Sequence, residues 1–400
     1  MGFYSDRLDR IKLSPSTAAT QRARELRAQG RDIIALTIGQ PDFDTPQHVK
    51  RAVNDALVRN ETKYPPIDGI PELKEAARRK FQRENALEYS ADQIMVGTGS
   101  KQIIFNAMLA TLGPGDEAII PAPYWISYLD MVLVSDGTPV EVACTPESGF
   151  KLTPAQLEAA ITPRTKWLLL NSPNNPTGAV YSRAEIRGLA DVLLRHPHVW
   201  ILTDDIYEHL RFDGIEFATI AQVEPKLYDR TLTVNGVSKA YAMTGFRLGY
   251  AAGPKELIRN IIKLQSQSTA GVSSISQWAA VEALNGPQEF IPERAAEFQR
   301  RRDRVLEMFK DIPGLQPNTP EGAFYLFVRC GDLYGRKTPQ GKVLKDEADV
   351  VLHLMDHGVA VVLGAAYGMS PYFRMSIATD IKKLEEACRR MQRAVAELTP

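Results

Sequence analysis

Between residues 94 and 234, short apolar segments alternate with stretches of helical character. The segments are Ile94–Val96, Ala118–Ile120, Trp167–Leu170, Trp200–Leu202 and Thr231–Val234, with helical stretches between most of them. Such alternation is typical of a mostly parallel sheet whose faces are covered by helices. We therefore predict an α/β fold, and we expect its functional side chains at the C-terminal ends of the strands.

The pattern changes after Gly286-Pro287. A long charged helix is expected at about 290–310, followed by the strand-like EGAFYLFV, a helix near 346–357, two further strands and a final helix. The final helix carries one apolar stripe, with steps of three and four residues, that reads as core. Its members are Ile381, Leu384, Cys388, Met391, Val395 and Leu398. We predict a second, smaller α+β unit here.

Composition excludes several classes of protein. Lysine plus arginine equals aspartate plus glutamate, 48 against 48, so no net field attracts nucleic acid or an anionic membrane. No apolar run approaches the roughly 18 residues of a membrane helix, and the N-terminus lacks an apolar signal core. The three cysteines (Cys144, Cys330, Cys388) form no pair and no metal-ligand spacing. We predict a cytoplasmic protein with no metal, no nucleic acid partner and no membrane contact.

Polar residues that the sheet itself does not need follow five of the predicted strands. They are the glycine-rich turn Gly97–Lys101, the aromatic Trp125, the loop Asn171–Gly178, the acids and tyrosine of Thr203–Tyr207, and Ser238-Lys239 with Arg247. Each has an ordinary structural interpretation as well: a plain turn, a core aromatic or a helix cap. Together, at successive strand ends, they indicate one site.

Lys239 is the residue of this set with the most distinctive chemistry. A partly buried lysine has a lowered pKa and offers a free amine at neutral pH, so Lys239 is a candidate Schiff-base residue. Ser238, Arg247 and turn amides nearby are groups that hold a phosphate. The alternative is a lysine at a strand end whose ammonium group reaches solvent.

Nine segments of the chain resemble the fold-type-I class I aminotransferases, which depend on pyridoxal 5'-phosphate (PLP), and in particular the bacterial branch that contains aspartate/prephenate aminotransferases. The segments are IGQPDFDTP (38–46), TKYPPIDGIPEL (62–73), GTGSKQ (97–102), PYWISY (123–128), NSPNNPTGAVY (171–181), TDDIYEHL (203–210), VNGVSKAYAMTGFRLGYAAGP (234–254), EGAFY (321–325) and FRMSIAT (373–379). They run nearly end to end. The resemblance implies a large PLP domain with a mixed, mostly parallel sheet (47–290) and a small α+β domain built from both termini (1–46 and 291–400).

The resemblance also implies the catalytic roles. Lys239 would bind the cofactor covalently and then carry a proton between the substrate and the cofactor. Asp204 would pair with the ring nitrogen, Tyr207 and Asn175 would hydrogen-bond the ring hydroxyl, and Trp125 would stack on the ring. The remaining cofactor-binding residues, which lie around the phosphate, are Gly99, Ser100, Lys101, Ser238 and Arg247. Tyr64 would reach the phosphate in the partner subunit, which makes the active site that of a homodimer.

Substrate binding is implied at residues from both ends of the chain: Lys12, Gly39, Lys101, Trp125, Asn175 and Arg374. Arg374 would grip the α-carboxylate of the substrate in a bidentate manner, and Gly39 would bring a backbone group to the same carboxylate. Lys101 and Lys12 would serve the distal acid of a dicarboxylate. Lys12 is also the position associated with prephenate, and its ordinary interpretation is a solvated lysine.

The predicted function is aspartate aminotransferase activity, from L-aspartate and 2-oxoglutarate to oxaloacetate and L-glutamate, by ping-pong kinetics, with prephenate as a second acceptor. Three alternatives stay open at this point: an aromatic or broad-specificity aminotransferase of the same fold, a PLP lyase or synthase on the same scaffold, and the aminotransferase-like domain of a transcription regulator. The last has no spare 60 or so residues for a DNA-binding module.

Overall fold

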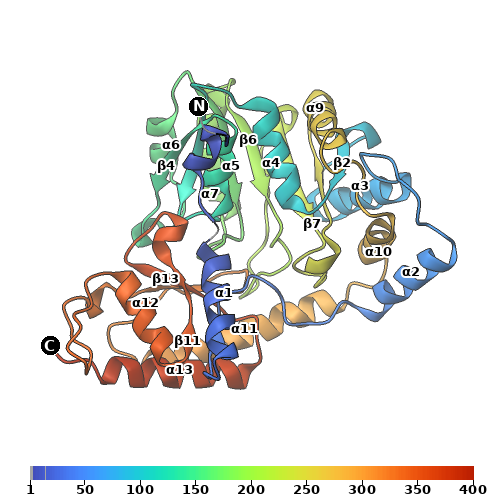
Figure 1. The fold of residues 1–400 in the computed structure, drawn as a ribbon. Coiled ribbons are helices and arrows are strands. Elements are labelled where there is room, and N and C mark those ends of the chain that lie inside the picture. Colours follow the sequence, from blue (N-terminus) through green and yellow to red (C-terminus); the bar gives the residue numbers. More distant parts are fainter. Residues whose placement is uncertain (1–2, 14) are drawn as a thin grey trace.

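The computed structural model describes residues 3–13 and 15–400, and its strands form three sheets (Figure 1). The largest sheet has seven strands in the order β2-β8-β7-β6-β5-β3-β4. Its strands are β2 (Ile94–Gly97), β3 (Glu117–Ala122), β4 (Thr138–Ala143), β5 (Thr165–Asn171), β6 (Trp200–Asp204), β7 (Thr231–Gly236) and β8 (Gly249–Ala252). All neighbours pair in parallel except β8, which is antiparallel to both β2 and β7. The predicted mixed, mostly parallel sheet is present.

Helices cover both faces of this sheet, because successive side chains of its strands point to opposite faces. In β5, Trp167 and Leu169 pack in one core cluster with helices α4, α5 and α9, whereas Leu168 and Leu170 pack in another with α6 and α7. The helices of this part are α2 (Gln47–Val58), α3 (Pro71–Asn85), α4 (Ser100–Thr111), α5 (Ser127–Val134), α6 (Pro154–Ala160), α7 (Arg183–Arg195), α8 (Ile220–Val223), α9 (Lys255–Ser266) and α10 (Ser274–Asn285). Burial on both faces explains why these strands read as continuous apolar runs.

Residues 15–35 and 290–400 come together in the second part of the molecule, in the lower part of Figure 1, whereas residues 6–10 pack against α5 of the large part. Its elements are α1 (Pro15–Ala28), β1 (Ile34–Ala35), α11 (Phe290–Phe309), β9 (Gln316–Pro317), β10 (Tyr325–Arg329), α12 (Glu347–Asp356), β11 (Val359–Ala360), β12 (Val362–Leu363), β13 (Tyr372–Ser376) and α13 (Ile381–Ala396). Strands β12-β13-β10-β9 form an antiparallel sheet, and β1 pairs in parallel with β11. The domain boundaries 1–46, 47–290 and 291–400 stay a prediction, and Met1, Gly2 and Ser14 lie outside the described residues.

The apolar stripe of α13 packs into the core of this second part. Five of its predicted members are buried there, and the sixth, Ile381, packs against the same cluster. The cluster also takes in side chains of α11, α12, β10 and β13. The stripe therefore fixes the last helix against the small sheet.

Three elements differ from the sequence prediction. The apolar run Asp32–Ile38, whose sequence predicts a strand, forms only the two-residue β1, and the apolar segments of the sequence predict neither β4 nor β8. Strand β8 consists of Gly249-Tyr-Ala-Ala252, a composition with weak strand propensity. It forms because it lies between β2 and β7, and its glycine allows close backbone packing.

None of the helices within residues 3–13 and 15–400 combines the length and the apolar character that crossing a membrane requires. The three cysteines are free and buried.

Removal of the Met391 side chain from α13 tests the packing of the last helix. Met391 is fully buried, so Met391→Ala should lower stability by about 2 to 5 kcal/mol through lost contacts and a cavity. Melting followed by circular dichroism should show a clearly lower midpoint. Lys383→Ala, on the exposed side of the same helix, should melt close to the wild type, and equal losses for both variants would contradict this account.

Candidate active site

A cavity of about 270 Å³ lies at the C-terminal ends of β5, β6 and β7. It is lined by all the predicted site residues except Lys12 and Tyr64: Gly39, Gly99, Ser100, Lys101, Trp125, Asn175, Asp204, Tyr207, Ser238, Lys239, Arg247 and Arg374. They come from strand-end loops of the large sheet, from the segment after β1, and from β13 of the small sheet. Their placement at strand ends follows from the parallel sheet.

Lys239 projects into this cavity from the loop after β7. Its Nζ donates a hydrogen bond to the carbonyl oxygen of Gly39 at 2.7 Å. Burial lowers the pKa of Lys239 to about 8, and the positive charge of Arg374 adds to this effect. With that pKa about one lysine in ten is a free amine at pH 7. Lys239 is thus a usable nucleophile and proton carrier at neutral pH.

Asp204 is a buried carboxylate with one bonded oxygen and one free oxygen. Its Oδ2 accepts a hydrogen bond from the hydroxyl of Tyr128 at 2.7 Å. Its Oδ1 is buried and has no hydrogen-bond partner among the described residues. Burial raises the pKa of Asp204 to about 6, although the bond from Tyr128 lowers it. Asp204 therefore presents an unsatisfied acceptor at the cavity.

The other end of the cavity is built for an anion. Helix α4 begins at Ser100, and its N-cap residue, Gly99, has the left-handed φ of 80°. A Cβ at Gly99 would lie 2.7 Å from Nη2 of Arg247, so a side chain there would displace the guanidinium group. The hydroxyl of Ser100 is held by the carbonyl oxygen of Asn235 at 2.8 Å. A helix N-terminus with an adjacent arginine is a favourable phosphate site.

Arg374 also lines the cavity, and it has no acidic partner within the described ranges. It is 3% exposed, and it donates to Asn175 Oδ1 at 3.0 Å and to the carbonyl oxygen of Thr37 at 2.7 Å. Its guanidinium carbon lies 4.3 Å from the ring centre of Tyr325. Its Nε has no hydrogen-bond partner among these residues. A buried guanidinium group with a spare donor suits a carboxylate ligand.

Four residues line the cavity to which the sequence prediction gave no individual role: Asn171, Ile206, Thr244 and Tyr325. The hydroxyl groups of Tyr325 and Tyr207 are 2.8 Å apart. Asn171 donates to the carbonyl oxygen of Asp204 at 2.8 Å and accepts from the backbone of Asn175 at 2.9 Å. For Tyr325, the sequence feature that could have indicated a site role is a hydroxyl group at the start of an otherwise apolar strand. For Asn171, it is the position in the Asn171–Gly178 loop.

Lys12 and Tyr64 lie outside the cavity in this single chain. Lys12 is exposed and borders a neighbouring hollow of about 620 Å³, which shares Lys101 and Arg247 with the cavity. Tyr64 is 98% exposed. The structure thus brings neither residue to Lys239.

The sequence model of the family described as aminotransferase class I and II matches residues 31–391. The chain belongs to this family. The resemblance drawn from the motifs is confirmed, and with it the α/β fold of these aminotransferases.

Relatives of this aminotransferase match it over nearly its whole length. It is 58% identical over 400 residues, all of both chains, to the aspartate/prephenate aminotransferase of Cereibacter sphaeroides. Its fold is similar to the crystal structure of the aspartate aminotransferase from Rhizobium meliloti, with a TM-score of 0.97, 56% identity and 100% of both chains covered. It is also similar to the Thermus thermophilus aspartate aminotransferase with maleate, with a TM-score of 0.92, 43% identity, and 98% of this chain and 100% of that chain covered.

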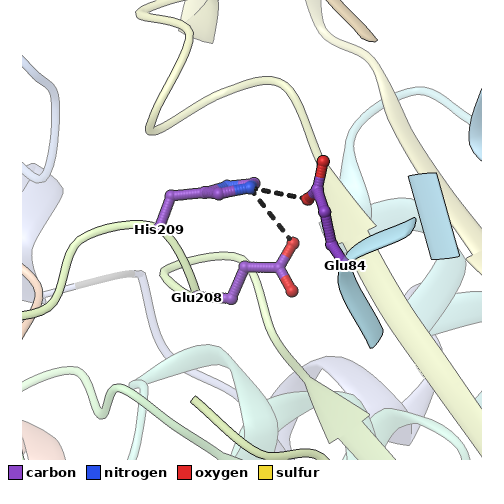
Figure 2. A group of neighbouring side chains, drawn as sticks. All are labelled: Glu84, Glu208 and His209. Atoms are coloured by element: carbon purple, nitrogen blue, oxygen red, sulfur yellow. Dashed lines mark hydrogen bonds and ion pairs between the residues drawn. The ribbon is translucent and has the colours of Figure 1, made fainter. Parts of the chain in front are cut away.

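Among the described residues of the aminotransferase, one group of three side chains has the spacing of metal ligands (Figure 2). His209 Nε2 lies 2.8 Å from Glu84 and 3.8 Å from Glu208. The ammonium group of the fully buried Lys80 forms an ion pair with Glu208 and lies 3.6 Å from Glu84. A metal ion would have to share both carboxylates with this ammonium group. We interpret the group as a partly buried ion-pair network.

The backbone contact between β8 and the α4 turn can be tested at Gly249. A Cβ there would lie 2.2 Å from the nitrogen of Ser100, so Gly249→Ala must displace the turn. We expect a loss of about 1 to 3 kcal/mol in stability, seen as a lower melting midpoint, and at least a tenfold loss of aminotransferase activity. Gly245→Ala is the matched control, because nothing lies within 4 Å of its added Cβ. A fully active Gly249→Ala enzyme would show that the turn does not depend on this contact.

Proposed function

We propose that this aminotransferase uses PLP to transfer the amino group of L-aspartate to 2-oxoglutarate, with prephenate as a second acceptor. The observation that carries the proposal is the arrangement of a buried lysine of lowered pKa, a buried carboxylate with a free oxygen, and a helix N-terminus with an arginine, all around one cavity. Oxaloacetate and L-glutamate would be the products.

The residues present fit PLP. Gly99 leaves space for the Arg247 guanidinium group beside the start of α4, and the backbone N–H of Ser100 together with Lys101, Ser238 and Arg247 offers donors for a phosphate. The free Oδ1 of Asp204 suits a protonated ring nitrogen, and the half-buried Trp125 offers an aromatic face. When bound, the cofactor supplies an aldehyde that condenses with amines and a cationic ring that draws electrons from the substrate.

Lys239 binds the cofactor and moves the proton. Its Nζ is held at the carbonyl oxygen of Gly39, a neutral acceptor that orients the amine without neutralising its charge. Because its pKa is about 8, the amine accepts a proton from the substrate Cα and gives it up again near neutral pH. Asp204 would hold a proton at the ring nitrogen, and Tyr207 and Asn175 would donate toward the ring hydroxyl.

The substrate is held by its carboxylates. Arg374 would bind the α-carboxylate, and Gly39 would bring its backbone to the same carboxylate; a Cβ at Gly39 would clash with the hydroxyl of Tyr325, so this close approach needs glycine. Lys101, whose Nζ lies 5.2 Å from the Trp125 ring centre, and Lys12 across the shared hollow provide cations for the distal acid. The Thermus thermophilus relative with maleate, a four-carbon dicarboxylate, supports this choice of substrate.

We further propose that the protein is a homodimer with shared active sites and that it works in the cytoplasm. Tyr64 is almost fully exposed in one chain and has no role there, whereas Tyr64 of the partner subunit would complete the phosphate site. Leu13, beside Lys12, is 91% exposed and is another apolar residue that a partner would cover. The three free, buried cysteines agree with a reducing compartment.

The amino donor can be identified from half-reactions of the purified protein with bound PLP. Aspartate and glutamate should each abolish the visible absorption band of the cofactor, and oxaloacetate or 2-oxoglutarate should restore it, because Lys101 and Lys12 favour dicarboxylates. Arogenate should do the same if prephenate is an acceptor.

Lys239→Ala should lose at least about 10⁴-fold in turnover, since one residue serves as both anchor and proton carrier.

Lys101→Ala and Lys12→Ala discriminate between the alternatives. Each should raise the KM for aspartate more than that for phenylalanine. If the visible band responds only to aromatic amino acids, the amino donor is aromatic and not aspartate. Consumption of an amino acid without any 2-oxo acid acceptor would indicate a lyase. A protein that binds no PLP would overturn the whole proposal.

Mixing two inactive variants tests the shared active site. Lys239→Ala and Tyr64→Ala homodimers should each have little activity. After subunit exchange, a mixed dimer contains one site with an intact Lys239 and an intact Tyr64 from the other chain. We expect activity to rise toward one quarter of the wild-type value at equal mixing, because about half of the dimers are mixed and each has one complete site. Activity that stays at the sum of the two variants would exclude a contribution of Tyr64 across the interface.

A further inference from the structure

We propose that Tyr128, which does not line the cavity, is a positioning residue that keeps Asp204 anionic and directs its free oxygen toward the cofactor. The inference rests on the proposed function, because it concerns the carboxylate that would meet the PLP ring nitrogen. It assigns to the Tyr128 hydroxyl a role that the motifs did not indicate.

Tyr128 is placed behind Asp204 by helix α5. It is 2% exposed, and its hydroxyl donates to Oδ2 of Asp204 at 2.7 Å. Its ring also meets the ring of Trp125 edge-on, with 5.3 Å between the centres. One side chain therefore supports both the ring-stacking residue and the carboxylate.

The bond from Tyr128 fixes which oxygen of Asp204 is free. With Oδ2 occupied by the hydroxyl, Oδ1 is the buried acceptor without a partner in the described part of the chain. Asn171 holds the backbone of the same residue through its carbonyl oxygen at 2.8 Å. Main chain and carboxylate are thus both fixed, and rotation of the carboxylate would break the bond to Tyr128.

The charge state of Asp204 depends on few neighbours. Three titratable side chains face Asp204: Tyr128 from α5, Lys239 from the loop after β7, and Tyr207 from the loop after β6. The negative charge of Asp205 helps to raise the pKa of Tyr128. Burial raises the pKa of Asp204 to about 6, and the Tyr128 bond is the largest contribution that opposes this rise, followed by a bond from the backbone of Ile206 and the charge of Lys239. The hydroxyl of Tyr128 is therefore the main protein group that favours the carboxylate form. Without it, a larger fraction of Asp204 would be protonated at neutral pH, and a protonated ring nitrogen would be held more weakly.

Tyr128→Phe removes the hydroxyl and keeps the ring contact with Trp125. The first readout is the carbon-13 shift of the Asp204 carboxyl in the full-length protein freed of cofactor, assigned by Asp204→Asn. Its titration midpoint should rise by about one to two pH units, because hydrogen bonds to charged groups are of this strength. The second readout is the PLP dissociation constant, measured by equilibrium dialysis from pH 6 to pH 9. We expect binding about two- to tenfold weaker than in the wild type at pH 7, with the two curves converging at pH 9, where Asp204 is anionic in both.

Tyr124→Phe is the matched control. The Tyr124 hydroxyl also donates to a carboxylate, Glu141 Oε2 at 2.6 Å, from the same segment of chain, but it has no contact with Asp204. In Tyr124→Phe, the titration midpoint of the Asp204 carboxyl and the affinity for PLP should match those of the wild type at every pH. A purely structural effect of losing a buried tyrosine hydroxyl would instead appear in both variants and would not depend on pH.

Equal Asp204 midpoints in Tyr128→Phe and the wild type would overturn the inference, as would PLP affinities that differ by one constant factor at all pH values. If Tyr128→Phe does not fold, 3-fluorotyrosine at position 128, a stronger donor of the same shape, should lower the midpoint, and an unchanged midpoint would count against the inference. A wild-type protein that binds no PLP would overturn the proposed function, whereas the carboxyl titration would still decide the role of Tyr128.

Discussion

The site depends on burying charged groups that the protein leaves without ion-pair partners. Lys239, Asp204 and Arg374 all line the cavity, and in the described ranges none of them forms a salt bridge. Buried ions usually need a partner, because each one loses several kcal/mol of hydration. Here the acceptors are neutral carbonyl oxygens, Gly39 for the lysine and Thr37 for the arginine. A charged ligand with complementary groups would therefore gain interactions that the protein alone leaves unmade.

The two sheets hold these charges in place from different sides. Lys239 and Asp204 follow neighbouring strands of the large sheet, where β6 and β7 pair in register, whereas Arg374 comes from the middle of β13 in the small sheet. The bond from Arg374 to Asn175 crosses between the two. Outside the cavity, the fully buried Lys80 does form an ion pair, with Glu208, which in turn accepts from Asn235 in β7 at 2.8 Å. Lys80 thus differs from Lys239, whose ammonium group is held only by a neutral carbonyl oxygen.

Sequence patterns were sufficient where a residue's role depends on its local position. The strand-end loops follow from the alternation of strands and helices, and the turn at Gly99 follows from its glycines. Patterns failed where the role depends on tertiary approach. Tyr325 and Tyr128 look like core aromatics, and only the folded chain brings their hydroxyls to Tyr207 and Asp204. Strand β8 was missed for a related reason, since its small residues are explained by backbone packing against the α4 turn.

The adjacent acids Asp204 and Asp205 show what the sheet adds to the sequence. The sequence alone does not show which of the two carboxylates would bind a cofactor, and only the family resemblance favours Asp204. Successive residues at a strand end point to opposite faces, so one carboxyl lines the cavity and the other turns away, bonded to Thr203. Burial raises the pKa of Asp205 to about 7, although the bond from Thr203 lowers it. The register of β6 thus brings the carboxylate of Asp204, and not that of Asp205, to the cavity, where Tyr128 donates to it.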